Sequence, residues 1–139
     1  MIIVKGTVDF EAGVMPGSEL IAAMGKFNEA LIDAGVLLAA EGLQPSANGA
    51  RVKFSGGAFT VTDGPFSEAK ELVGGFWIIE VKSKQEALDW VRRIPFEDGE
   101  EAELRKVSEA SDFPADEISG EALAREQAWR DENQKPVTL

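Results

Sequence analysis

Residues 60–81, with the sequence TVTDGPFSEAKELVGGFWIIEV, decide the fold because they join two strands through a turn that cannot be extended. Gly64 permits unusual backbone dihedrals, and Pro65 fixes its own φ and keeps Gly64 out of the α region. The Asp63 carboxylate can accept hydrogen bonds from backbone N–H groups just beyond Pro65. This pattern predicts a rigid corner that carries a carboxylate, followed by an apolar strand over Phe76–Val81.

Other apolar segments extend this strand into a sheet. Ile2–Val8 and Val36–Ala40 are apolar without strict alternation, which is typical of strands that are buried on both faces, and Phe76–Val81 shares the pattern. Glu101–Val107 alternates weakly and is predicted to be an edge strand.

A β-hairpin is predicted just before the corner. If Gly56-Gly57 forms a two-residue turn, Phe54 lies opposite Phe59 and Val52 lies opposite Val61. These apolar side chains then share one face of the hairpin. Polar residues take the other face: Arg51, Lys53, Thr60 and Thr62.

Helical signals occur in three places. Ser18 is expected to cap a helix whose apolar side chains step by four and three residues and which Gly35 ends. Ser83 and Glu86 form a capping box for a second helix. A third helix is expected from Ser119, and because an exposed Trp129 would be costly, this helix should dock on its own sheet or on a partner.

The order of these elements, β-α-β-(β-β)-β-α-β-α, predicts an α+β fold with a ferredoxin-like βαββαβ plan, an inserted β-hairpin and a C-terminal helix. Two helices can cover only one face of a sheet, although three of its strands are apolar on both faces. The uncovered face would expose more than the roughly few hundred Å² of contiguous apolar surface that monomers tolerate. A homodimer with its sheets packed face to face is therefore predicted.

Composition limits the chemistry that the chain can perform. The 139 residues are expected to form one domain and include no Cys, His or Tyr. Thiol nucleophiles, His-dependent catalysis and the usual zinc sites are thereby excluded, and acid–base work would fall to Asp, Glu or Lys. Neither a cofactor nor a metal is predicted. The lack of cysteine, the strand-like start and the absence of a long apolar stretch predict a cytoplasmic protein without membrane contact.

Negative charge gathers in the C-terminal part of the chain. The net charge of −11 divides into −3 for residues 1–96 and −8 for residues 97–139. Such a surface repels phosphate backbones, so no nucleic-acid partner is expected. We predict an α+β domain over residues 1–110 and, over residues 111–139, an acidic extension with a helix. The simplest role of the acidic end is solubility.

Several short motifs follow one another in a specific order: Glu41-Gly42-Leu43-Gln44-Pro45-Ser46, Thr62-Asp63-Gly64-Pro65-Phe66, Lys70-Glu71-Leu72 and Gly74-Gly75-Phe76. In this order they resemble the YCII-related family, whose members are called DGPF-domain proteins, and the resemblance covers nearly the whole chain. It implies a dimeric α+β barrel and, for some members, a location beside extracytoplasmic-function sigma factors. Members of the wider superfamily use a His-Asp pair. This chain has Gln44 where close relatives often carry a histidine, which argues against a His-dependent mechanism.

The candidate catalytic residues are the carboxylates Glu41 and Asp63. Glu41 ends an apolar strand and could lie at a pocket mouth, although a solvated acid at a strand end explains it equally well. Asp63 could be a general base, but anchoring the turn is the more frequent use of an Asp before Gly-Pro. If the two carboxylates shared a cleft, one could donate a proton to a substrate while the other accepted one.

Five residues are candidates for binding a ligand: Arg51, Phe66, Lys70, Glu71 and Trp77. Arg51 could meet an anionic ligand, although a charge on an edge strand is a simpler explanation. Lys70 and Glu71 could merely solvate their segment. Phe66 and Trp77 could line a deep pocket.

Two functions remain open, and the residues do not decide whether the chain is an enzyme. The first is binding of a small molecule in a cleft near the dimer interface, with carboxylate acid/base chemistry of an isomerase or lyase. The alternative is a non-catalytic binding or regulatory module in which Asp63 is structural. Such a module could be linked to sigma-factor regulation. A deep pocket with inward carboxylates would favour the first function and a filled interior the second. A heme or aromatic-substrate oxygenase would rest on fold analogy alone and would lack an axial histidine.

Overall fold

The structure is a computed structural model that describes residues 1–67, 71–114, 116 and 119–139, and it confirms the α+β class. The strands are β1 (Ile2–Lys5), β2 (Leu37–Gly42), β3 (Ala50–Ser55), β4 (Ala58–Asp63), β5 (Val73–Ile79) and β6 (Ala102–Leu104). The helices are α1 (Val8–Glu11), α2 (Ser18–Asp33), α3 (Lys84–Val91) and α4 (Ser119–Asn133), with 3₁₀ turns η1 (Ser46–Asn48) and η3 (Ala110–Asp112). Within these residues, no helix is both long and apolar enough to cross a bilayer.

One antiparallel sheet has the strand order β2-β5-β1-β6, and β3 and β4 form a separate hairpin. The central strand β1 places Ile2 opposite Trp77 on β5 and opposite Leu104 on β6. β6 is an edge strand, as its weak alternation predicted. At the other edge, the Val137 N–H donates to the Leu37 carbonyl of β2 at 2.7 Å. The C-terminal tail therefore returns to the sheet.

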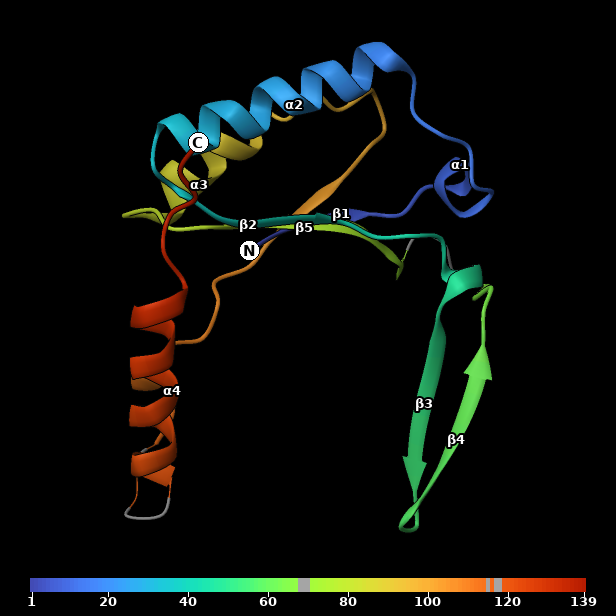
Figure 1. Cartoon of the computed structure of the whole chain (residues 1–139). Helices are drawn as coiled ribbons and strands as arrows, with labels where there is room; N and C mark the ends of the chain where they lie inside the picture. The colour runs from blue at the N-terminus through green and yellow to red at the C-terminus, as the bar shows by residue number, and fades with distance from the viewer. Residues whose placement is uncertain (68–70, 115, 117–118) are drawn as a thin grey trace.

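Helices α2 and α3 cover one face of this sheet (Figure 1). Buried apolar side chains from both layers form the core: Ile2, Phe27, Leu31, Leu37, Trp77, Trp90 and Ile94. The Phe27 ring lies at its centre, edge-on to Trp77 and Trp90 with centroid distances of 5.4 and 6.4 Å. The apolar stripe predicted for the first long helix therefore faces the sheet.

The helix ends follow the predicted signals only in part. α2 begins at Ser18, but its N-cap is the preceding glycine and no side chain caps it, so the predicted Ser18 cap is wrong. Gly35 ends the helix as predicted, with a φ of 68°. Ser83 caps α3 by accepting a hydrogen bond from the Glu86 N–H at 3.1 Å. The Glu86 carboxylate accepts its bond from the Lys82 N–H, one residue earlier than a capping box requires.

Four strand boundaries also differ from the predicted ones. β2 covers Leu37–Gly42 instead of Val36–Ala40, and β6 covers Ala102–Leu104 instead of Glu101–Val107. The segment predicted as one strand over residues 2–8 divides into β1 and the start of α1 at Val8. β5 contains Gly74 and Gly75 instead of following them. A Cβ atom on Gly75 would lie 2.8 Å from the Glu41 carbonyl oxygen, so β5 and β2 can approach closely only because this position has no side chain.

The predicted register of the hairpin is confirmed. Phe54 pairs with Phe59 and Val52 pairs with Val61 across the turn at Gly56-Gly57, where both φ angles are positive. Every residue of β3 and β4 is exposed, with Phe54 and Phe59 at 78% and 68%. We call Val52, Phe54, Phe59 and Val61 the hairpin stripe.

The sheet face opposite α2 and α3 carries side chains from neighbouring residues of β1, β2 and β5, and most of them are apolar. Ile3 and Glu41 both pair with Phe76, and Ala39 pairs with Ile78. Because side chains alternate along a strand, these five residues lie on the face away from the core. We call this surface the helix-free face.

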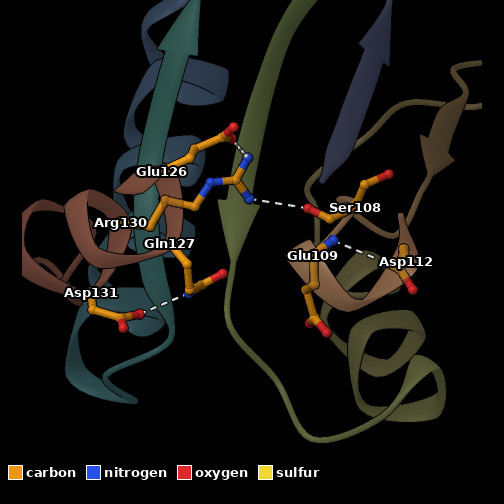
Figure 2. Close-up of polar contacts among 7 residues, drawn as sticks. All are labelled: Ser108, Glu109, Asp112, Glu126, Gln127, Arg130 and Asp131. Carbon is orange, nitrogen blue, oxygen red and sulfur yellow. Dashed lines mark hydrogen bonds and ion pairs between the residues drawn. The ribbon is translucent and has the colours of Figure 1, made fainter. Parts of the chain in front are cut away.

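Helix α4 and the hairpin both project from the sheet on the side of the helix-free face (Figure 1). Arg130 holds α4 beside η3, because its Nη1 donates to the Ser108 carbonyl at 3.0 Å while its Nη2 lies 2.5 Å from Glu126 (Figure 2). Trp129 is 56% exposed. Of the two predicted places for this helix, its own sheet leaves Trp129 exposed, and docking on a partner stays a prediction.

Candidate functional site

The corner over Asp63–Phe66 rests directly on η1. The Gly64 N–H donates to the Gly49 carbonyl at 3.0 Å, and the Phe66 N–H donates to Ser46 Oγ at 2.9 Å. A Cβ atom on Gly64 would lie 1.8 Å from the Ser46 carbonyl oxygen, and the Gly64-Pro65 peptide bond is cis. Backbone therefore touches backbone here, and only glycine fits at position 64.

Glu11 at the end of α1 completes the support of the corner. Its two carboxylate oxygens accept hydrogen bonds from the Ser46 N–H at 3.1 and 3.2 Å, and the Ser46 hydroxyl donates to Glu11 Oε2. Ser46 thus joins three segments that are far apart in the sequence. The sequence drew attention to Ser46 only as part of a motif and did not relate it to Glu11, because no periodicity connects residues 35 positions apart.

Asp63 does not anchor the corner as predicted. The N–H groups of Gly64 and Phe66 donate to other acceptors, and the Asp63 carboxylate accepts no hydrogen bond from any described residue. The physical reason is that the hydroxyl of Ser46 occupies the acceptor position that the sequence assigned to Asp63. The Asp63 carboxylate is left exposed at the end of β4.

This difference predicts the result of a comparison between two alanine variants. Ser46→Ala should lower the free energy of unfolding by about 1–3 kcal/mol, because the partly buried Phe66 N–H loses its acceptor and the Glu11 carboxylate keeps the Ser46 N–H but loses the Ser46 hydroxyl. Asp63→Ala should change it by less than about 0.5 kcal/mol, as for an ordinary surface position. Urea unfolding followed by tryptophan fluorescence measures both values. A larger loss for Asp63→Ala than for Ser46→Ala would restore the anchoring role to Asp63.

Arg51 lies over the corner from β3. Its guanidinium carbon is 4.0 Å from the centroid of the Phe66 ring, a geometry that contributes about 0.5–1 kcal/mol at an exposed site. Among the described residues, Arg51 has no carboxylate partner. With respect to this part of the chain, the N–H donors of the stacked guanidinium are available to an anion.

The two candidate carboxylates belong to separate sheets. Glu41 lies exposed at the end of β2 on the helix-free face, and Asp63 ends β4 in the hairpin. No contact among the described residues joins their side chains. A single copy of the chain therefore brings Asp63, Phe66 and Arg51 together at the corner. No contact among the described residues joins Glu41 to them.

The remaining candidates lie elsewhere or outside the described residues. Trp77 is buried at 6% exposure, and its Nε1 donates to Asn28 Oδ1 at 2.8 Å beneath α2. The hydrogen bond from Lys5 to Glu103 is the main cause that raises the pKa of Lys5, and the negative charge of the exposed Glu71 adds to it. Lys70 lies outside the described residues.

Two hollows on the described surface lie away from the corner. One, of about 20 Å³, separates η3 from α4 around Arg130 (Figure 2). The other, of about 250 Å³, is lined by Lys5, Gly6, Thr7, Gly99, Glu100 and Glu101. Neither of these two hollows is lined by Glu41, Asp63 or Trp77.

Comparisons with known proteins place these features in a family. The sequence profile of the YCII-related domain matches residues 1–111. An uncharacterised protein of Rhizobium meliloti (strain 1021) is 41% identical over 63 residues, which are 45% of this chain and 51% of that protein. The match thus spans about half the length of that relative. The corner, η1 and the hairpin lie within the family match, whereas α4 lies beyond it.

Proposed function

The chain belongs to the YCII-related family, and from this premise we propose that it is a homodimer that binds a small anionic molecule beside the corner. The observation that carries the proposal is the stacking of Arg51 on Phe66 without a carboxylate partner among the described residues. In a chain of net charge −11, a cation held over an aromatic ring and not paired with any described carboxylate is suited to an anionic ligand.

Two features support the homodimer. The strand order and the positions of α2 and α3 fit a ferredoxin-like βαββαβ plan into which the β3–β4 hairpin is inserted. The helix-free face of that plan carries Ile3, Ala39, Phe76 and Ile78, which would lose contact with water if the same face of a second copy covered it. Two sheets packed in this way would form the dimeric α+β barrel that the resemblance implies.

The dimer would also provide the surface that closes the ligand site. Glu41 shares the helix-free face with the apolar residues, so the sheet of a partner would cover this carboxylate. Asp63 would remain at the end of the hairpin that lies nearest the corner. Two carboxylates in different surroundings can divide the roles of proton donor and proton acceptor. We therefore retain Glu41 and Asp63 as proposed acid and base residues of an isomerase or lyase.

A thermal-shift experiment tests the binding proposal. Phosphate and a panel of small mono- and dicarboxylates are added to the purified protein, since a ligand that binds only the folded state raises the melting temperature. We expect at least one of them to raise the Tm of the wild type and to leave Arg51→Gln unshifted. Lys53→Gln is the matched control, because Lys53 shares the polar face of the hairpin but is not stacked on Phe66. Equal shifts in both variants would remove Arg51 from the site.

The alternative is a binding or regulatory module without turnover, including one that acts in sigma-factor regulation. It is favoured by the absence of contacts between Glu41 and Asp63 among the described residues and by the position of Trp77 in the core. Ligand binding that persists in Glu41→Gln and Asp63→Asn, with no chemical change of the ligand by wild type, would select this alternative. A cytoplasmic location and a domain boundary at residue 110 belong to both proposals.

A further inference from the structure

The two outer strands of the four-stranded sheet differ in how well they resist pairing with another strand. β6 forms one edge with three residues, and its central residue is the charged Glu103. β2 forms the other edge with six residues, and the segment Val36–Ala40 at its start is apolar throughout, without charge or proline. Short strands and charged side chains keep edges apart, whereas a longer uncharged apolar edge is a template for a further strand. The apolar end of β2 is therefore where another strand would pair.

Residues 135–139, which we call the strap, reach this end of β2. The Val36 carbonyl accepts a hydrogen bond from the Glu80 N–H at 2.8 Å and so points into the sheet. The next carbonyl, that of Leu37, points out of the sheet edge and accepts the Val137 N–H at 2.7 Å. Figure 1 shows the strap running from the end of α4 past the sheet to the point marked C. A strand that paired along the whole of β2 would have to displace it.

The strap does not form a new edge at which a further strand could pair. Pro136 has no N–H to donate, and Lys135 places a charge beside it. Proline and lysine are residues with which natural proteins blunt exposed sheet edges. Val137 is 37% exposed and Leu139 is 91% exposed, so the strap contacts the sheet at Val137. The strap thus covers the Leu37 carbonyl without presenting a new ladder of donors.

A single hydrogen bond can hold the strap in place because the contact is intramolecular. Arg130 fixes α4 beside η3 through the Ser108 carbonyl, and only residues 134–136 lie between the end of α4 and Val137. A short tether of this kind gives an effective concentration on the order of mM, well above the concentration of a second molecule in a micromolar solution. The strap is therefore favoured over another copy in the competition for the β2 edge.

We propose that the strap blocks the edge of β2 against pairing with the same edge of a second copy of the chain. In such an assembly, two β2 strands pair antiparallel about a two-fold axis and join two sheets into one. The end of β2 that the strap leaves open carries Glu41 and Gly42, a charge and a residue of low strand propensity, so the strap lies at the end that pairs more readily. This role is independent of the homodimer proposed above, in which the sheets meet by their faces. It assigns a function to residues beyond the family match.

Analytical ultracentrifugation tests the proposal by comparing two variants with the wild type. A chain shortened to residues 1–134 lacks the strap but keeps Gln134, whose N–H donates to the Arg130 carbonyl at the end of α4. Val137→Pro keeps the strap but removes the N–H that the Leu37 carbonyl accepts. We expect the weight-average mass of both variants to rise toward about twice that of the wild type as the protein concentration is raised, since two copies pair. The reference is the wild type's own mass, so the result does not depend on the proposed homodimer.

Thr138→Pro is the matched control for these variants. It also introduces a proline into the strap, but no described residue accepts a hydrogen bond from the Thr138 N–H, so its mass should equal that of the wild type. The proposal is overturned if the shortened chain keeps the wild-type mass or if Val137→Pro behaves like Thr138→Pro. Circular dichroism checks that each variant is folded. If the shortened chain fails to fold, the comparison of the two proline variants decides alone.

Amide hydrogen exchange identifies the surface through which the shortened copies associate. The Leu43 N–H donates to the Gly74 carbonyl, so the alternation of an antiparallel ladder directs the N–H groups of Gly42 and Ala40 away from β5. We expect these two amides to exchange at least about tenfold more slowly in the associated shortened chain than in the wild type, because pairing with a second β2 engages them. Association with unchanged exchange at Ala40 and Gly42 would place the contact on another surface and overturn the proposal.

Discussion

Replacing Gly64 with alanine is expected to lower the free energy of unfolding by about 3 kcal/mol or more, at the upper end of what overpacking a rigid site costs. The new Cβ atom would lie 1.8 Å from the Ser46 carbonyl oxygen, 2.6 Å from its carbon and 3.2 Å from the Ala47 nitrogen. These are backbone atoms, which cannot turn aside as a flexible side chain can. The corner must therefore move off η1, and the Phe66 N–H then leaves the Ser46 hydroxyl.

Gly49→Ala provides a control that meets the same neighbour. A Cβ atom on Gly49 would lie 3.5 Å from the Ser46 carbonyl oxygen, which is an ordinary contact, and we expect a change below about 1 kcal/mol. Chemical denaturation of both variants gives the comparison. If Gly64→Ala unfolds at the same urea concentration as Gly49→Ala, the corner does not rest on η1 in the way described.

The second large effect is expected at Trp77. Trp77→Ala should cost about 3–5 kcal/mol, as truncation of a buried tryptophan usually does, because the side chain fills the core against Phe27. Trp77→Phe keeps an aromatic ring but leaves Asn28 Oδ1 without its donor, and should cost about 1–3 kcal/mol. Melting curves and urea titrations measure both losses.

The same variants decide whether Trp77 belongs to the ligand site. If Trp77 is a core residue, replacing it changes the stability of the protein and leaves the ligand affinity of the folded protein unchanged. If Trp77→Phe instead abolished the ligand-induced thermal shift at unchanged stability, Trp77 would be a binding residue. Met15→Ala is the control for both measurements, because Met15 is exposed in the loop before α2 and should change stability by less than about 0.5 kcal/mol.

The hairpin phenylalanines and the candidate carboxylate Asp63 differ in how well the sequence could predict their contacts. Phe54 and Phe59 were paired correctly because the pairing depends on a two-residue turn between them and on alternation along each strand. Asp63 was given the wrong role because the choice between Asp63 and Ser46 as acceptor depends on a segment 20 residues away from Phe66. Local turn chemistry offers Asp63 the bond, but tertiary contact gives it to Ser46.

The sequence by itself determined the α+β class, the register of the hairpin, the edge position of β6, the end of α2 at Gly35 and the cap at Ser83. Each of these depends on residues within a few positions of one another, so their spacing and backbone preferences can be read from the sequence. Tertiary structure alone decided that Glu11 and Ser46 hold the corner, that Arg51 stacks on Phe66 and that Trp77 belongs to the core. These contacts join segments that are distant in the chain, and the free energy that selects among them comes from packing and desolvation, which no local pattern records.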